Sequence, residues 1–137
     1  MGMNDHKKHK GLDLERFAEE YFNYSDKTTD KHFQAWDFFW ELGHTDPESA
    51  WELILILVKM AKNKRELSYL AAGPLEDLVD YHGELFIDRI ENEVRKNNRF
   101  AWTILCVWPG KRNKEIYERF TKLQKKYKNH TIPLSDE

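Results

Sequence analysis

The chain has 137 residues, the usual size of one compact domain, and 40% of them are hydrophobic, 34% charged and 14% aromatic. This aromatic content excludes a largely disordered protein, because disordered chains contain few aromatic side chains. The formal net charge of −2 excludes a uniformly basic protein, but it conceals a strong separation of the two signs along the chain.

The charge changes sign near residue 95. Residues 11–94 carry 19 acidic and 8 basic side chains, whereas residues 95–128 carry 2 acidic and 11 basic ones. Such polarity steers association with a charged partner. It also allows the two parts of one chain to attract each other, and the sequence leaves both interpretations open.

The sequence predicts a cytoplasmic protein without a membrane partner. Its longest apolar run, residues 53–58, is far shorter than the roughly 20 residues that cross a bilayer. No apolar stretch follows the basic start of the chain, so no signal peptide is predicted. The single cysteine, Cys106, excludes an intramolecular disulfide and fits a reducing compartment.

The N-terminal part begins with a basic segment, residues 1–10, which we expect to be flexible and to precede a single helical domain, residues 11–128. His6 and His9 lack the further ligands that a metal site needs. A first helix is predicted from apolar residues spaced three and four apart, namely Leu12, Leu14, Phe17, Ala18, Tyr21 and Phe22. Polar residues 23–27 then predict a turn.

The second helix is predicted to begin after a cap at Thr29 or Asp30, whose side-chain oxygens accept hydrogen bonds from the free amides of a first turn. It is expected to end at Gly43, since glycine commonly follows the last helical turn. Its apolar residues are Phe33, Trp36, Phe39 and Trp40.

The third helix has the clearest start. Asp46 is a capping residue, and Pro47 occupies the first helical position, where its missing N–H costs nothing. Apolar residues then cover most of the circumference of residues 53–58, which predicts the most buried helix of the protein. We expect the core to contain Trp51, Ile54, Leu55 and Val58.

Further short helices follow to the end of the domain. A fourth, residues 65–72, is expected to break at Gly73 and Pro74, because proline lacks the backbone donor and clashes with the preceding turn. A helix opened by Pro74 is expected to close at Gly83, and another to follow with Phe86, Ile87, Ile90 and Val94 on its buried face. Asn97 and Asn98 predict a turn, and Pro109 and Gly110 end a short apolar helix.

The last predicted helix is basic, with Ile116, Phe120, Leu123 and Tyr127 as its apolar face, and a loose tail is expected over residues 129–137. The predicted fold class is therefore all-α. We expect a compact bundle of seven or eight short helices with solenoid-like antiparallel helix pairs.

No catalytic motif is visible, and we predict no enzymatic activity, no cofactor and no metal. Glu76, Asp77 and Asp80 resemble a carboxylate patch for magnesium, but acidic residues in the first turn of a helix also stabilise its dipole. Cys106 lies in an apolar run, where burial makes a thiol inert. His82 shares an apolar stripe and is expected to bond a neighbouring helix end, although an acid–base role stays open.

The strongest candidate surface is an acidic hairpin, residues 76–93, which contains seven acidic residues and one arginine. A concentration of unpaired negative charge suits a basic partner. The predicted partner-binding residues are Glu76, Asp77, Asp80, His82, Glu84, Asp88, Arg89 and Glu91. The alternative is a solvated face whose negative charge is partly neutralised by Arg89 and Arg95.

The C-terminal bases offer a second, less favoured surface. Together with Tyr117, Phe120 and Tyr127 they resemble the mixture of cations and aromatic rings that binds single-stranded nucleic acid. At helical spacing, however, the same aromatic residues form an ordinary core face. A protein partner is therefore favoured over nucleic acid.

The segment Leu70-Ala-Ala-Gly-Pro-Leu-Glu-Asp-Leu-Val-Asp-Tyr-His-Gly83, followed by Phe86-Ile-Asp-Arg-Ile-Glu91, resembles an uncharacterised family of small bacterial helical proteins with an Ala-Gly-Pro-Leu-Glu-Asp-Leu signature. In that family a Trp-rich part precedes the signature, as it does here, and the resemblance covers residues 33–108. The family implies a helical fold but no activity. In size, charge and style the chain also resembles immunity proteins that guard bacterial toxin systems.

These observations lead to one expected function and two alternatives. We expect a non-catalytic protein that binds and neutralises a basic bacterial toxin domain, because an inhibitor needs only a complementary surface. A helical-repeat adaptor is the first alternative, and a metal-dependent hydrolase or nuclease that uses the acidic cluster is the second.

Overall fold

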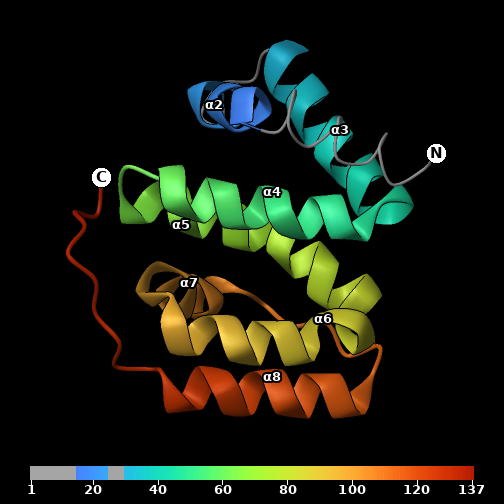
Figure 1. Cartoon of the computed structure of the whole chain (residues 1–137), viewed down its shortest axis with the longest axis vertical. Coiled ribbons are helices and arrows are strands. Elements are labelled where there is room, and N and C mark those ends of the chain that lie inside the picture. The colour runs from blue at the N-terminus through green and yellow to red at the C-terminus, as the bar shows by residue number, and fades with distance from the viewer. Residues whose placement is uncertain (1–14, 25–29) are drawn as a thin grey trace.

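The structure is a computed structural model that describes residues 15–24 and 30–137 (Figure 1). Several predictions fall outside the described residues. They are the basic segment, the first-helix residues Leu12 and Leu14, most of the turn at residues 23–27, and the cap Thr29. The same holds for the side chains of Phe33 and Trp36.

The fold is all-α, as predicted, and the described part of the chain contains no strand. Its helices are α2 (Glu15–Tyr24), α3 (Asp30–Thr45), α4 (Pro47–Met60), α5 (Lys64–Leu70), α6 (Glu76–Lys96), α7 (Asn98–Thr103) and α8 (Lys114–Lys126). A π-helical turn, η2 (Ala71–Leu75), joins α5 to α6, and a 3₁₀ turn, η3 (Ile104–Cys106), extends α7. None of the described helices combines the length and the apolar character needed to cross a membrane.

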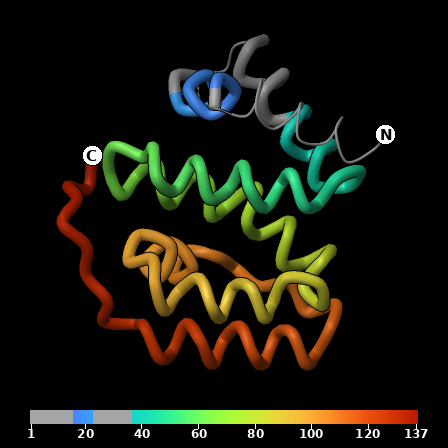
Figure 2. The backbone as a smooth tube through the Cα atoms, viewed as in Figure 1, coloured from blue at the N-terminus to red at the C-terminus, as the bar shows by residue number. Residues whose placement is uncertain are grey.

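The helices are arranged around α4 (Figure 2). Helices α2 and α3 cover one side of α4, and α7, α6 and α8 follow on the other side. Helix α4 contacts α2, α3, α5, α6 and α7. The apolar circumference of residues 53–58 explains this position, since a helix that is hydrophobic all round is stable only when other elements surround it.

The start and the core of α4 confirm the sequence prediction. Ser49 donates two hydrogen bonds to the Asp46 carboxylate, from its backbone N at 3.2 Å and from its hydroxyl at 2.6 Å, and Pro47 is the first helical residue. Trp51, Ile54 and Val58 are buried, while Leu55 is only partly buried against the same core.

The predicted helix break at Gly73 and Pro74 is wrong. The chain stays helical from α5 through η2 into α6, and the flanking Leu70 and Glu76 both have right-handed helical dihedral angles. A π-helical turn is wider than an α-helical one, so it gives the ring of Pro74 room beside the preceding turn. Pro74 is buried there, which favours continuation over a turn in solvent.

Two glycines that were predicted to end helices lie inside them. Helix α3 continues past Gly43 to Thr45, where the N–H of Asp46 donates to the carbonyl of Leu42 at 2.7 Å. Helix α6 continues past Gly83 with a kink at His82, whose φ is −131° and ψ is 24°. Neither glycine has the positive φ of a helix-ending position, so both allow the helix to continue.

The C-terminal segment, although mostly exposed, contacts the rest of the fold. Ile132 is buried, and the carbonyl oxygens of Ser135 and Asp136 accept hydrogen bonds from the N–H groups of Lys64 and Arg65 at 2.8 and 3.1 Å. In Figure 1 this segment runs from the end of α8 back to the start of α5. It satisfies the free amides of the first turn of α5, a role that needs no periodicity in the sequence.

Candidate functional site

Three of the six acids of the predicted surface are paired with arginines of the basic C-terminal part. Arg119 reaches both Asp88 and Glu91 at 2.7 Å, and the Nε of Arg112 lies 3.0 Å from an Asp80 oxygen. The expectation of unpaired negative charge is therefore wrong for these three acids. Acidic residues four apart line one face of α6, and α8 packs against that helix. The two oppositely charged parts of the chain thus attract each other.

Two more members of the predicted surface have structural partners. Arg89 donates to both carboxylate oxygens of Glu48 at 2.6 and 2.8 Å, and its hydrogen bonds to Glu48 raise its pKa. Arg89 therefore joins α6 to α4 and does not neutralise the acidic residues of α6. Glu84 accepts a hydrogen bond of 2.7 Å from the side chain of Asn113.

His82 lies at the kink of α6 and confirms the structural interpretation of this residue. It is half-buried, and its Nε2 lies 2.7 Å from the carbonyl oxygen of Gly43 in the last turn of α3. Since a carbonyl only accepts, Nε2 carries the proton and donates. His82 thereby satisfies a carbonyl oxygen near the end of α3 and fastens the kink of α6 to that helix.

Among the described residues, no cation lies at ion-pair distance from the carboxylates of Glu76 and Asp77. Glu76 accepts a hydrogen bond of 3.1 Å from the backbone N–H of Trp108. Burial raises the pKa of Asp77, Glu76 raises it further, and His44 opposes the shift. The predicted helix dipole does not stabilise the Asp77 carboxylate, because η2 continues into α6 and leaves no helix N-terminus at Asp77.

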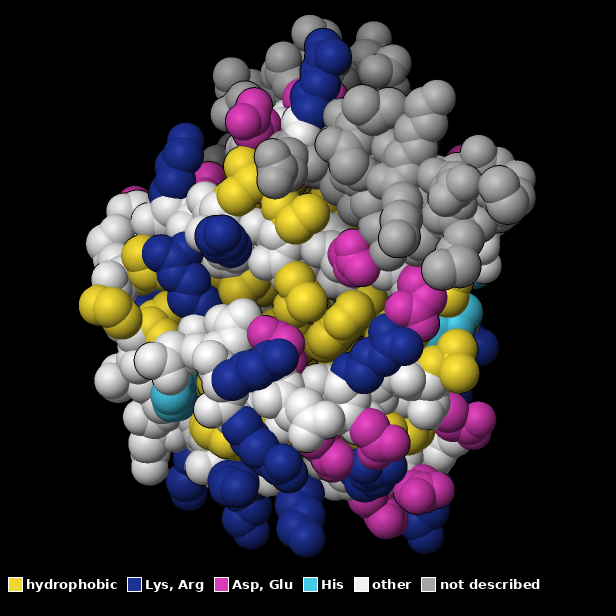
Figure 3. Space-filling model, in the orientation of Figure 1, with side chains coloured by type: hydrophobic (Ala, Val, Ile, Leu, Met, Phe, Trp, Pro, Cys, Tyr) yellow, Lys and Arg dark blue, Asp and Glu magenta, His cyan; other side chains and the backbone are white. Residues whose placement is uncertain are grey.

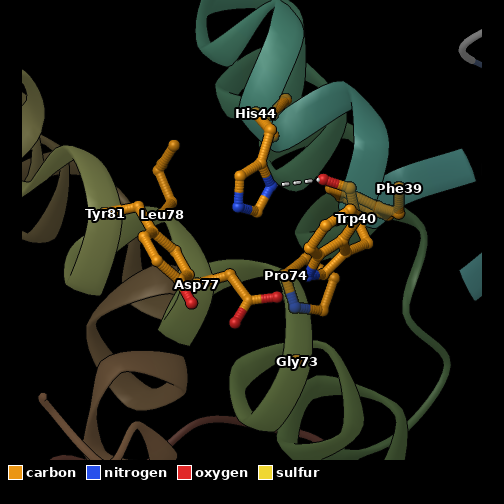
Figure 4. A pocket seen from close by; sticks show the side chains of 10 residues that line it. Phe39, Trp40, His44, Gly73, Pro74, Asp77, Leu78 and Tyr81 are labelled. Atoms are coloured by element: carbon orange, nitrogen blue, oxygen red, sulfur yellow. Dashed lines mark hydrogen bonds between the residues drawn. The ribbon is translucent and has the colours of Figure 1, made fainter. Parts of the chain in front are cut away.

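A row of stacked side chains lies beside Asp77 and was not predicted. The ring of Trp40 lies 4.1 Å from that of His44, His44 lies 4.8 Å from Tyr81, and the guanidinium of Arg112 lies 4.3 Å from the Tyr81 ring. Figure 4 shows Trp40 and His44 from α3 facing Asp77 and Tyr81 from α6. We call Trp40, His44, Tyr81 and Arg112 the stacked row.

The stacked row is accessible to a partner. Trp40 is 48% exposed and Tyr81 is 42% exposed, although most aromatic residues of the described part are buried or half-buried. Leu85, four residues after Tyr81, is 65% exposed. It lines a groove of about 400 Å³ together with Tyr81 and Arg112. The stacked row, Asp77 and Leu85 form what we call the aromatic–acidic surface.

The aromatic–acidic surface is shaped to contact another protein and not to enclose a substrate. The cavity between Trp40, His44, Asp77 and Tyr81 measures about 20 Å³, which is room for about one water molecule. In residues 15–24 and 30–137, no group of three or more His, Cys, Asp or Glu side chains is placed to hold a metal ion. Cys106 is half-buried, and burial raises its pKa, as expected for an inert thiol.

Sequence reasoning missed the stacked row because its members come from three separate segments. Trp40 was grouped with the apolar residues of its helix, yet its side chain is largely exposed. The available signals were the four-residue spacings of Trp40 with His44 and of Tyr81 with Leu85. Each pair lies on one helix face, opposite the buried stripe of that helix.

Comparison with known proteins gives a family but no activity. The family described as "Family of unknown function (DUF6869)" matches residues 24–128, which include every residue of the aromatic–acidic surface. No curated protein and no solved structure matches the chain. Since the matched region covers well over half of the chain, the protein belongs to this family of unknown function, DUF6869.

Proposed function

We propose that this protein is a non-catalytic binding protein that holds a basic protein partner on its aromatic–acidic surface. The observation that carries the proposal is the exposed stacked row. Tryptophan, tyrosine and arginine are the residue types that contribute most to protein–protein affinity, especially when they cluster. In this row His44 links Trp40 to Tyr81, and Arg112 lies over the Tyr81 ring.

The row is held in place before any partner arrives. The Nδ1 of His44 donates to the carbonyl of Trp40 at 2.9 Å, and Arg112 is fixed by Asp80 while its guanidinium lies over Tyr81. Side chains that are already ordered lose little conformational entropy on binding. A preorganised exposed aromatic row therefore favours association.

The charges beside the row favour a basic partner. Burial raises the pKa of Asp77, so its charged form is less favourable in the folded protein than in water. A cationic group of a partner would stabilise that carboxylate, and Glu76 and Glu84 would add to the attraction. Groups with perturbed pKa values are common at functional sites, where stability is exchanged for function.

The specific form that we propose is a cytoplasmic immunity protein for a bacterial toxin. Neutralising a toxin requires a complementary surface and no chemistry, and toxins that cleave nucleic acid are commonly basic. The size and charge that the chain shares with immunity proteins support the same proposal. The toxin would present its basic cleft to Asp77 and an apolar rim to the stacked row.

Affinity capture from the source cells, with matched bait variants, tests this proposal. The wild-type protein and a Lys122→Ala, Lys126→Ala control should capture the same basic protein, whereas a Trp40→Ala, Tyr81→Ala bait should not. The captured protein is then purified, and its affinity for each bait is measured by calorimetry. Thermal melts confirm that all baits are folded.

A second arm of the experiment tests neutralisation. Expression of the captured protein should arrest growth, and co-expression of the wild-type protein should restore it, whereas the Trp40→Ala, Tyr81→Ala variant should not. Equal affinity of the partner for wild type and this variant would remove the aromatic–acidic surface from the interface. Binding without rescue of growth would retain the binding function and reject the immunity function.

A further inference from the structure

A second groove, lined by residues 105–111 and by α8, shares no lining residue with the aromatic–acidic surface. Its volume is about 560 Å³. One wall is apolar and consists of Leu105, Val107, Trp108 and Pro109. Trp108 is 79% exposed, the highest exposure among the large hydrophobic residues that the structure describes. Such a side chain at the edge of a groove offers an apolar contact to a ligand.

The apolar wall is fixed by hydrogen bonds from both sides. The side-chain amide of Gln124 in α8 donates to the carbonyls of Ile104 and Val107, both at 2.8 Å. On the opposite side, the backbone N–H of Trp108 donates to Glu76. The groove is therefore formed before a ligand binds, which lowers the entropic cost of binding.

The charged residues of this groove are all lysines. Lys111, Lys125 and Lys128 line it, and no acidic side chain does. Within the described chain none of these three has an ion-pair partner, whereas Arg112 and Arg119 are used to bind the acids of α6. Figure 3 shows Lys and Arg side chains gathered over α8 in the lower part of the molecule. Three lysines without an ion-pair partner among the described residues therefore lie at this groove.

We propose that this groove is a second binding site, and that its ligand is a short acidic peptide segment with a large apolar side chain. The apolar side chain would lie against Trp108 and Val107, while the acidic residues would meet the lysines. This site prefers the opposite charge to the aromatic–acidic surface. It can therefore hold its ligand while the basic partner is bound or absent.

The wall chemistry favours a peptide over nucleic acid. Single-stranded nucleic acid needs several exposed rings along a cationic track, but Leu105, Val107 and Pro109 are aliphatic. The ring of Tyr117 already has Lys111 over it at 5.7 Å. A long polyphosphate along α8 would also meet the exposed Glu115 and Glu118. A short segment with a few carboxylates avoids that repulsion.

The proposal is tested with a labelled peptide of about 12 residues made of Glu and Leu, with Leu at every third or fourth position to form one apolar face. Fluorescence anisotropy at low salt should show saturable binding to the full chain. Trp108→Ala, or Lys125→Glu with Lys128→Glu, should each weaken binding by about tenfold or more. Lys122→Glu with Lys126→Glu, the same charge change outside this groove, should weaken it by about threefold at most.

Three results would overturn the proposal. One is an absence of saturable binding by the peptide, and another is equal weakening by the two lysine pairs. The third is tighter binding of labelled single-stranded DNA than of the peptide, which would make the groove a nucleic-acid site. The Trp40→Ala, Tyr81→Ala variant should bind the peptide normally, so failure of the proposed basic-partner site and failure of this groove are distinguishable.

Discussion

At the residue scale, Trp51 joins three helices. Its ring lies 5.7 Å from the ring of Phe86 in α6 and 5.6 Å from that of Phe100 in α7. Phe86 and Phe100 are fully buried. Because the surrounding helices cannot close the space that a bicyclic ring occupies, its removal would leave a cavity in the core.

We predict that Trp51→Ala lowers the free energy of unfolding by about 3–5 kcal/mol, through lost burial and the remaining cavity. Urea denaturation followed by circular dichroism measures this change. Trp108→Ala serves as the matched control, since an exposed side chain is expected to matter by about 0.5 kcal/mol at most. Similar midpoints for the two variants would contradict the central position of Trp51.

Asp77 gives a prediction in which stability depends on pH. Burial raises its pKa, so its contribution to stability is fully present below the unfolded value of about 4 and is lost as the pH rises through the folded value. Asp77→Asn should therefore raise the melting temperature at neutral pH, and this gain should disappear near pH 3. If the proposed function is right, the same variant also binds the basic partner less tightly.

Thermal melts of wild type and Asp77→Asn between pH 3 and pH 7 measure this difference, with pH 3 chosen to lie below the unfolded Asp value of about 4. Asp88→Asn is the control, because it removes an exposed ion pair with Arg119 and should leave stability equal or lower at neutral pH. A gain for Asp77→Asn that persists at low pH would show that its cause is not the charge of Asp77.

At the scale of elements, the close approach of α6 and α8 depends on Gly83. A Cβ atom at this position would lie 2.6 Å from the Cγ2 of Ile116 in α8. Ile116 is buried and β-branched, so its side chain has little freedom to move away. The missing side chain therefore allows the kinked part of α6 to pack against α8.

We predict that Gly83→Ala destabilises the protein by about 1–3 kcal/mol through overpacking. Ile116→Leu removes the β-branched methyl group and should restore part of the loss in the double variant. Gly43→Ala is the control, because nothing lies within 4 Å of a Cβ there, and it should stabilise α3 by up to about 1 kcal/mol. Chemical denaturation of all four variants tests the prediction, and equal effects of the two glycine substitutions would refute it.

At the scale of the whole molecule, the charge separation along the chain is resolved within the fold. Arg119 and Arg112 hold the basic C-terminal part against the acids of α6. Two surfaces of opposite charge remain, namely the groove lined by Lys111, Lys125 and Lys128 and the surface around Asp77. Exposed ion pairs contribute little individually. Their main effect here is to specify which face of α8 turns toward α6 and which remains available.

We predict that Arg119→Glu lowers stability by about 1 kcal/mol at low salt, because it places a third acid beside Asp88 and Glu91. Glu91→Arg in the same chain should restore most of the loss, and high salt should reduce the effect by screening. Lys122→Glu, an exposed change on the same helix, should have a smaller effect. Denaturation at two salt concentrations decides between these outcomes, and a lack of rescue by Glu91→Arg would refute the pairing.

The sequence by itself determined the all-α fold class and the central position of α4. Its caps and apolar spacing are local signals: Asp46 and Pro47 begin α4, and the apolar circumference of residues 53–58 requires burial wherever that helix lies. The bond of His82 to a neighbouring helix end was also predictable, because a histidine on an apolar stripe needs a polar partner.

Only the tertiary structure decided the path through Pro74, the pairing of the acids and the composition of the candidate surface. Packing buries Pro74 and keeps the chain helical, although its local preference is to break a helix. Arg119 is about 30 residues distant from Asp88, and the stacked row joins residues from three segments. Local spacing carries no information about which distant side chains meet, since that depends on how the helices pack.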